Sequence, residues 1–504
     1  MKRKKDLYRL IHAMSKSEKR YFNLDAKKSG KKDAAYLQLF NTINKMETYD
    51  ESVLKAKFKH LSVDKAYLYN AILRSMRDYH SKKSRAAQIK EHLMDAKYLY
   101  ERELYDLCEA ALQEAKQLAE ELGDHLSLLV INKEERKLVR ATKQKGYPEK
   151  LEQLLEEKNE NLEAAQEEYQ YLDLYDRIWK DSVQNIQIKD GEKEKFRNKA
   201  GLILNRKQDD FKSIIAEHRY YQSSSFFYQN IGEYDKVFDY RYKAMNWWDK
   251  NPKYKEEAFY NYIIDLSNFL AACFKRERFD LFNEILEKLE KEEPANTHHQ
   301  KVLFQKYYQF KLVYNINYGI TSEAKKISEL VEDGLKRFTF PESTKKVFVM
   351  NTSLLLFVGD LFSDCIYWTN GLLASSNKNS TRMETNRGMY FVKLISSYEI
   401  DDFELFDNTI RSTNRFLIKD NNQYLEYYLK FLDKIKKLPS VPIDEVKYLL
   451  QDLKNYINQM RQEIKGRVPL GGIDEMTIWW IDSKLQKKSI AEIVRAGRKT
   501  SQKS

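Results

Sequence analysis

A short turn recurs along this chain at multiples of about 42 residues. Its copies share an aromatic residue that is followed within two positions by an acidic one: Tyr105-Asp106, Tyr234-Asp235, Phe279-Asp280, Phe362-Ser363-Asp364 and Phe403-Glu404. Successive lead aromatics are 129, 45, 83 and 41 residues apart, close to three, one, two and one periods. A fixed period of this length is typical of repeat proteins built from helical hairpins, in which each hairpin buries its apolar face against its neighbours.

Turns rich in glycine or proline fall near the positions where the period predicts further copies. They are Gly146-Tyr147-Pro148, Asp190-Gly191-Glu192, Gly319-Ile320-Thr321 and Val441-Pro442-Ile443. Glycine readily adopts the left-handed conformation that ends a helix, and proline fits the first turn of the next one. These four turns therefore support a continuous array of helix pairs.

The composition fits a folded, soluble and mostly helical protein. The chain has 504 residues, too many for one core, but only 15 Gly and 7 Pro, and 33% of its residues are charged. The most apolar stretch, residues 347–358, is shorter than the ~20 residues of a membrane-spanning helix, so no membrane partner is expected. Cys108, Cys273 and Cys365 are isolated in the sequence, which predicts reduced core residues and a cytoplasmic location.

Positive charge is concentrated at the two ends of the chain. Residues 1–100 hold 24 Lys+Arg and 11 Asp+Glu, a net of +13, and residues 484–504 hold seven and one, a net of +6. Because the whole chain carries +12, residues 101–483 carry 12 − 13 − 6 = −7. The excess of basic residues therefore does not belong to the repeat array.

The sequence predicts an all-α fold, a right-handed α-α superhelix of helical hairpins preceded by a small helical domain. We expect a basic helical N-terminal domain at residues 1–83, a repeat array at 84–465, and a C-terminal capping helix with a frayed basic tail at 466–504. Within the array, residues 148–158 and 161–188 are expected to form two separate helices. The lead aromatics Tyr234 and Phe279 are expected to be buried between adjacent hairpins.

The segment from His218 to Asp249 resembles a tetratricopeptide repeat. Gly232-Glu233-Tyr234-Asp235 corresponds to the turn of that family between its two helices, Ala244 to its small residue in the second helix, and Tyr221 to its first-helix aromatic. The period of about 42 residues exceeds the family's period of about 34, so the array is divergent. An array of the HEAT type has a matching period and is the second choice for the fold.

No catalytic, cofactor-binding or metal-binding residue is predicted. The chain contains no Walker A, dinucleotide-binding or H-E-x-x-H motif and no C-x-x-C pair. The closest histidines, His298 and His299, are adjacent and would point about 100° apart on a helix, so they are poor ligands for one metal ion. The sequence therefore favours a protein that is not an enzyme and needs no cofactor.

The resemblance implies a non-catalytic scaffold that binds a protein or peptide on its concave face. In tetratricopeptide arrays the first helix of each pair lines that face. Carried over to this chain, the partner-binding residues would be Arg219, Gln222, Phe226, Gln229, Asn230, Ser267 and Lys275. Their amides and cations suit peptide groups and carboxylates. The sequence identifies neither the partner nor the oligomeric state.

The alternative function is a nucleic-acid-binding regulator, with the basic N-terminal domain as reader and the array as sensor or dimerisation domain. Residues 50–58, a short turn and residues 63–80 resemble a helix-turn-helix, although the turn lacks the usual glycine and has His60 there. The candidate contacts are Lys65, Arg74, Arg77, Lys82, Lys83 and Arg85. A helical cap on the first repeat, with a solvated basic face, would show the same pattern.

Overall fold

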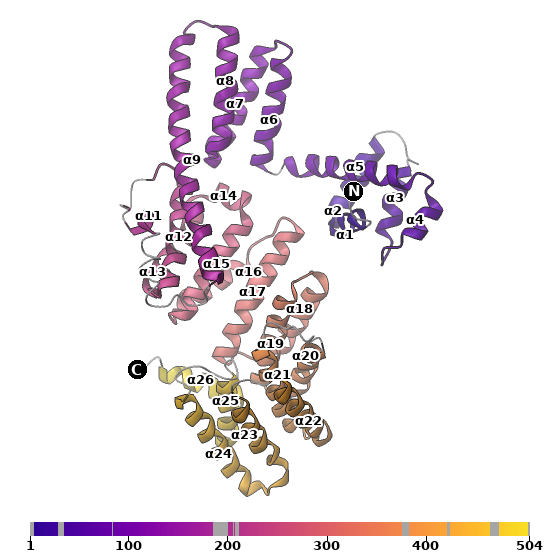
Figure 1. The fold of residues 1–504 in the computed structure, drawn as a ribbon, viewed down its shortest axis with the longest axis vertical. Helices are drawn as coiled ribbons and strands as arrows, with labels where there is room; N and C mark the ends of the chain where they lie inside the picture. The colour runs from indigo at the N-terminus through magenta and orange to yellow at the C-terminus, as the bar shows by residue number, and fades with distance from the viewer. Residues whose placement is uncertain are drawn as a thin grey trace. The chain divides into compact units, whose positions relative to one another are not determined.

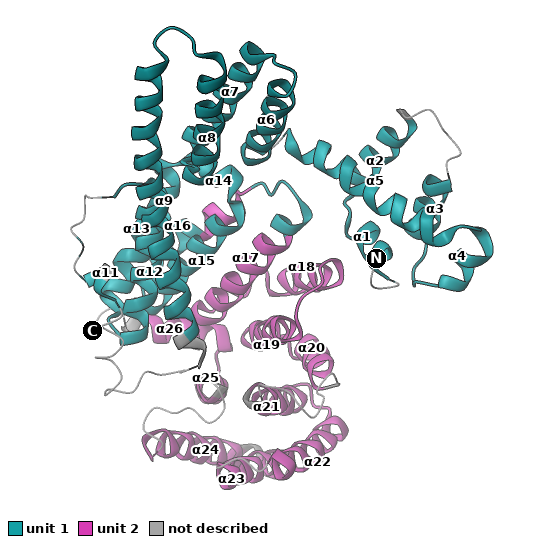
Figure 2. Cartoon of the chain, turned by 45° about the horizontal axis from the view of Figure 1, so that its top comes forward, with its two compact units in different colours: residues 1–285, 293–300 teal, residues 286–292, 301–504 magenta. Residues whose placement is uncertain are grey.

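The computed structural model of the chain describes residues 5–28, 35–82, 84–184, 200–204, 206, 211–374, 383–420, 424–463 and 473–501. Within these ranges every regular element is a helix and there is no strand (Figure 1). The helices divide between two compact units, residues 1–285 with 293–300 and residues 286–292 with 301–504 (Figure 2).

The first five helices of unit 1 enclose a core of their own. They are α1 (Asp6–Ala13), α2 (Lys16–Lys28), α3 (Ala35–Asn44), α4 (Glu51–Lys57) and α5 (Leu61–Ser81). Each contributes apolar side chains to one buried cluster, including Ile11, Phe22, Phe40, Leu54 and Leu68. Helix α5 packs against α2 and α3, so it holds this group of helices together.

The rest of unit 1 is a series in which each long helix packs against the next. It comprises α6 (Arg85–Tyr100), α7 (Tyr105–Leu122), α8 (His125–Thr142), α9 (Tyr147–Gln184), the short α11 (Gly201–Leu204), α12 (Ile214–Ile231), α13 (Tyr234–Lys250), the short α14 (Pro252–Glu257) and α15 (Phe259–Lys275). The order of contact is α6, α7, α8, α9, α12, α13 and α15. Two further helices are α16 (Phe279–Glu290) and α17 (Thr297–Tyr318), and the chain changes from one unit to the other within α16, between the two helices and within α17.

Unit 2 continues with the same kind of packing. Its helices are α18 (Ala324–Arg337), α19 (Glu342–Val358), α20 (Phe362–Ala374), α21 (Met383–Glu399), α22 (Phe403–Asp420), α23 (Leu425–Lys436), the single 3₁₀ turn η1 (Leu438–Ser440), α24 (Ile443–Glu463), α25 (Ile473–Gln486) and α26 (Ile490–Ser501). Each α-helix from α18 to α26 packs against the next one. The predicted fold class, an all-α solenoid of helical hairpins, is confirmed.

The five recurring turns share one backbone geometry. Helices α7, α13, α16, α20 and α22 each begin at the lead aromatic of a turn. Two residues before that aromatic, the backbone is always left-handed: φ is 59° at Glu103, 83° at Gly232, 55° at Glu277, 57° at Asp360 and 56° at Asp401. Because only one of these positions is glycine, the repeat is clearer in the backbone than in the sequence.

The buried residue of each turn is the third one after the lead aromatic. It is Cys108, Val237, Phe282, Cys365 or Phe406, and each of these is at most 4% exposed. The prediction that Tyr234 is buried between hairpins is wrong, because its side chain is 40% exposed, and Phe279 is only partly buried. The reason is geometric: the first residue of a helix lies at its open end, whereas a residue one turn further along faces the neighbouring helix.

Helix α9 replaces the two helices predicted at residues 148–158 and 161–188. It runs without interruption over 38 residues, from Tyr147 to Gln184. No glycine or proline follows Pro148 within it, and Leu154, Ala164, Tyr171 and Leu174 continue one buried face. Residues 185–188 and the predicted turn at 190–192 lie outside the described residues.

The predicted frayed tail contains a helix, α26. Ser489 and Glu492 form a capping box: the Glu492 carboxylate accepts from the Ser489 amide at 2.8 Å, and the Ser489 hydroxyl accepts from the Glu492 amide at 3.2 Å. Behind this cap Ile490 and Val494 are buried in the core of unit 2. The sequence prediction missed this helix because basic residues surround its few apolar ones. In the preceding helix α25, where a cap was predicted, Trp480 is fully buried in the same core.

Candidate functional site

Helices α12, α13 and α15 position most of the residues predicted to bind a partner. Helix α12 begins at the N-cap Ser213, whose hydroxyl accepts from the amides of Ile215 and Ala216, and it ends at the left-handed Gly232. Helix α13 starts two residues later and packs against both α12 and α15. The three helices therefore form one layered group.

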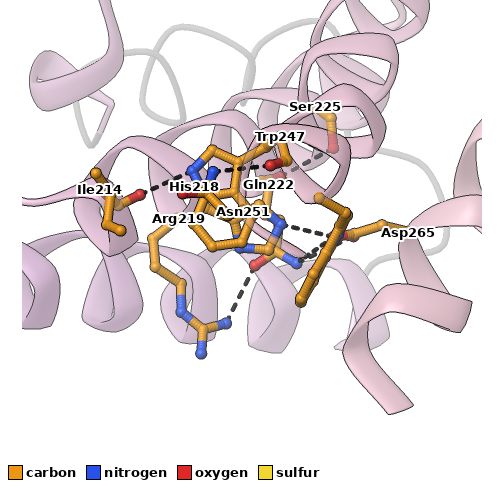
Figure 3. A network of polar contacts seen from close by, with 9 residues as sticks. Ile214, His218, Arg219, Gln222, Ser225, Trp247, Asn251 and Asp265 are labelled. Carbon is orange, nitrogen blue, oxygen red and sulfur yellow. Dashed lines mark hydrogen bonds and ion pairs between the residues drawn. The ribbon is translucent and has the colours of Figure 1, made fainter. Parts of the chain in front are cut away.

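A buried carboxylate joins these helices. Asp265 on α15 is 3% exposed and accepts hydrogen bonds from His218 Nε2 at 2.7 Å and Gln222 Nε2 at 3.0 Å (Figure 3). It also accepts one from Trp248 Nε1 at 2.9 Å. The donors come from α12 and α13, so a single side chain bridges all three helices. A buried carboxylate is costly unless it is well bonded, and this one has three donors.

Stacking on a tryptophan ring fixes the orientation of His218. Its ring stacks on that of Trp247, with 4.4 Å between the ring centroids, and Trp247 Nε1 donates to the Ile214 carbonyl at 3.0 Å (Figure 3). At the end of α13, Asn251 Nδ2 donates to the Trp247 carbonyl at 2.8 Å. With both rings held in this way, the cluster acts as a rigid support below the surface of the helices.

Two cavities lie on the surface of this helix group. The larger, of about 280 Å³, is lined by Gln229, Tyr234, Val237, Arg241, Ala271, Ala272, Lys275 and Arg276. The smaller, of about 130 Å³, is lined by Tyr175, Gln222, Ser225, Phe226, Arg241, Ala244, Ile264, Asp265 and Asn268. Arg241 lines both cavities, so they adjoin at its side chain. We refer to the two together as the α12–α15 groove.

Arg241 is the central cation of the groove. Its Nη1 donates to the Asn268 carbonyl at 3.0 Å, and its Nη2 contacts Oε1 of Gln229. Burial lowers the pKa of Arg241 to about 10, while the charge of Asp265 opposes that shift. The guanidinium is therefore poorly hydrated, still charged at neutral pH, and held in place by α12 and α15.

The open end of the groove carries two further cations. Lys275 Nζ lies 3.0 Å from the centroid of the Tyr234 ring, a cation–π contact, and Arg276 pairs with Asp235. Lys275 is exposed. The groove thus combines an aromatic edge with cations that are only partly neutralised.

The predicted partner-binding residues divide into two groups. Gln222, Phe226, Gln229 and Lys275 line the groove. Arg219, Asn230 and Ser267 do not: Arg219 donates to Gln222 Oε1 at 3.1 Å along the same helix, Asn230 is partly buried, and Ser267 is buried and donates to the Ile263 carbonyl at 2.6 Å. A buried side chain offers no contact to a partner, so Ser267 belongs to the core.

Sequence reasoning missed the contribution of the second helix of the hairpin. Tyr234, Val237 and Arg241 all lie on α13 and line the larger cavity. They are three and four residues apart, which places them on one helix face. That spacing is visible in the sequence, but the expectation that only first helices line the concave face excluded it.

The basic residues predicted to contact nucleic acid also divide. Arg74, Arg77 and Lys82 are exposed, and none of them pairs with an acidic side chain of the described residues. Lys65 Nζ donates to the Tyr49 hydroxyl at 2.8 Å and lies 3.5 Å from the Glu51 carboxylate. Arg85 pairs with Glu256 at 2.8 Å, which raises its pKa. Lys83 lies outside the described residues.

Within the part of the chain that the structure describes, no three His, Cys, Asp or Glu side chains come together in a group that could hold a metal ion. No helix found there has both the length and the apolar character needed to cross a membrane.

The chain was also compared with known proteins. No family model matches it, and no match was found among the curated proteins or among the solved structures. The resemblance to tetratricopeptide repeats therefore depends on the turn and hairpin residues of this chain alone.

Proposed function

We propose that the chain is a non-catalytic, tetratricopeptide-like scaffold that binds an acidic protein segment or peptide in the α12–α15 groove. The observation that carries this proposal is the position of Arg241 in a groove that four predicted residues also line, the cation Lys275 among them. A partly desolvated guanidinium is a strong donor to carboxylates and peptide carbonyls.

The size and rigidity of the groove favour a peptide over a small-molecule cofactor. Its larger cavity of about 280 Å³ lies just below the range of about 300–1,000 Å³ that is usual for small-molecule sites. It is open at Lys275, so a chain could continue beyond it. The Asp265 cluster below holds the helices in one arrangement, which reduces the entropy lost on binding.

We also propose a cytoplasmic location. All three cysteines, Cys108, Cys273 and Cys365, are free and buried in helix packing. Reduced core cysteines are usual in proteins of reducing compartments. The alternative function, a nucleic-acid-binding regulator, depends on a different surface, that of α5.

The test fills the groove without removing any of its contacts. Ala271 is exposed and lines the larger cavity, so Ala271→Trp places a large side chain in it. Ala110, exposed on α7, provides a matched control as Ala110→Trp. The intact chain, both variants and Lys275→Glu are used as baits in a lysate of the source cells, and captured proteins are quantified by mass spectrometry.

The expected result is a partner that wild type and Ala110→Trp retain equally and that Ala271→Trp and Lys275→Glu lose by at least about tenfold, a change of about 1.4 kcal/mol. Its binding segment, made as a synthetic peptide, should be acidic. The proposal fails if every retained protein binds Ala271→Trp as well as Ala110→Trp, or if the binding segment is basic.

A further inference from the structure

Helices α4 and α5 have the connection of a helix-turn-helix. Helix α4 ends at Lys57 and α5 begins at Leu61, so three residues, 58–60, join them. Phe58 and His60 both have negative φ, −122° and −113°, so this turn needs no glycine where His60 stands. Leu54, Phe58 and Leu68 share the buried core, which fixes α5 relative to α4.

One face of α5 is open to solvent along most of its length. Six of its exposed residues lie within about 100° of one another around the helix axis and so share one side of the helix: Val63, Ala66, Tyr67, Asn70, Arg74 and Arg77. Val63 is 69% exposed and Tyr67 58%, although both are residue types that cores usually take. From Val63 to Arg77 the stripe is about 21 Å long at 1.5 Å per residue.

The charges around this face are almost all positive. Arg74 and Arg77 form no ion pair with a described residue, and Lys55, Lys57 and Lys59 are exposed on α4 and the turn. Of the acidic residues on α5, Asp64 is partly buried, and Asp78 is exposed four residues after Arg74, at the edge of this face, without forming an ion pair with that arginine. Glu51 lies beside Lys65. The exposed face of α5 therefore presents cations that form no ion pair and are available to a partner.

We propose that this face of α5 binds the major groove of duplex DNA, independently of the α12–α15 groove. An α-helix with its side chains is about 10–12 Å wide, which fits the major groove of B-DNA, about 12 Å wide. Arg74, Arg77 and the lysines of α4 contact phosphates. Asn70, Tyr67 and Val63 lie between them on the same face and meet base edges, where an amide suits adenine and apolar groups suit the thymine methyl.

The observations favour DNA over other acidic partners. Duplex RNA has a deep, narrow major groove that side chains cannot read, so a helix face of this kind does not fit it. Carboxylates of an acidic protein could bind lysines and arginines on any kind of surface and do not require a helix. The three-residue turn and the uninterrupted 21-residue α5, in contrast, match the geometry of a helix placed in a DNA groove.

The experiment measures binding of the full chain to a fluorescently labelled 24-base-pair DNA duplex by anisotropy over a range of KCl concentrations. Arg74→Ala/Arg77→Ala removes two proposed phosphate contacts. Arg177→Ala/Lys180→Ala is the matched control, because these residues are exposed on α9 at the same spacing and neither pairs with a described acidic residue. Circular dichroism confirms that each variant is as helical as wild type.

The expected result is salt-sensitive binding in which each phosphate contact contributes about 0.9 to the slope of log affinity against log salt. The Arg74/Arg77 variant should lower the magnitude of that slope by about 2, and the control should leave it unchanged. The proposal is overturned if the chain does not bind the duplex at 50 mM KCl, if the two variants behave alike, or if an RNA duplex of the same length binds equally well.

Discussion

The left-handed residue of the recurring turn leads to a prediction in which one substitution type has opposite effects at two sites. Gly232 has a φ of 83°, whereas Gly371, inside α20, has no left-handed φ. A Cβ atom added at either glycine would meet nothing within 4 Å. Replacing each glycine by alanine therefore tests backbone conformation alone, without a steric clash.

The magnitudes follow from the two conformations. An L-residue in the left-handed region costs about 1–2 kcal/mol, and the loss of glycine's freedom in the unfolded chain returns about 0.4–1 kcal/mol. Gly232→Ala should therefore destabilise the α12–α13 hairpin by about 1 kcal/mol. Gly371→Ala should stabilise α20 by up to about 1 kcal/mol, because alanine has the higher helix propensity. Glu103 has a left-handed φ of 59° in the exposed turn before α7. Because glycine adopts this conformation without the cost that a side chain adds, Glu103→Gly should stabilise that turn.

Native-state hydrogen exchange read by mass spectrometry measures these effects locally, so the two units need not unfold together. About 1 kcal/mol corresponds to about a fivefold change in the population of the open state. Peptides from α12 and α13 should exchange about fivefold faster in Gly232→Ala, and peptides from α20 should exchange more slowly in Gly371→Ala. Changes of the same sign in the two variants would refute the reasoning.

Three other predictions concern burial. Phe282→Ala should lower the opening free energy of its hairpin by about 3–5 kcal/mol, and Tyr234→Ala by less than about 1 kcal/mol, because only Phe282 is fully buried. Equal losses in hydrogen exchange would contradict the burial pattern. Asp265→Ala should destabilise α12, α13 and α15 by about 3–5 kcal/mol, measured by hydrogen exchange in increasing urea, since the buried donors of His218 and Trp248 and the partly buried donor of Gln222 lose their acceptor; a loss below about 1 kcal/mol would show that they find water instead. Cys273 and Cys365 are fully buried, and burial raises the pKa of both to about 12, so at pH 8 a thiol reagent should modify both at least about 10³-fold more slowly in the native chain than in urea. Native rates close to those in urea would show that the thiols are accessible.

The helices and their order could be predicted because their signals are local. An aromatic and an acidic residue mark the start of α7, α13, α16, α20 and α22 in the sequence itself. The left-handed position before each start could not be recognised, because four of its five occupants are Glu or Asp, which also occur throughout exposed helix faces. The tertiary fold imposes that conformation on residues other than glycine.

The candidate sites could be predicted only in part, since residues distant in the sequence determine which basic side chains are paired and which are available to a partner. Lys65 and Arg85 were indistinguishable in the sequence from Arg74 and Arg77. In the structure, Arg85 pairs with Glu256, which is 171 residues away, and Lys65 lies against Tyr49 and Glu51. No spacing rule reports such pairs. Arg241 was missed for a different reason: only first helices were expected to line the concave face, whereas α13, a second helix, packs between α12 and α15 and lines the groove.

The distribution of charge separates the two proposed surfaces by the kind of acidic partner that each can bind. Residues 101–483 carry a net charge of −7, and residues 214–275, which span α12 to α15, hold eight acidic and eight basic side chains, so they offer a long polyanion no net attraction beyond that of the groove cations Arg241 and Lys275. A short acidic segment brings few charges and meets mainly those two cations. Residues 1–100, at +13, attract a polyanion along the whole exposed face of α5. If both proposals hold, Ala271→Trp abolishes peptide binding and leaves the salt slope for DNA unchanged. Arg74→Ala/Arg77→Ala lowers the magnitude of that slope and leaves peptide binding unchanged. Each proposal can thus fail without the other.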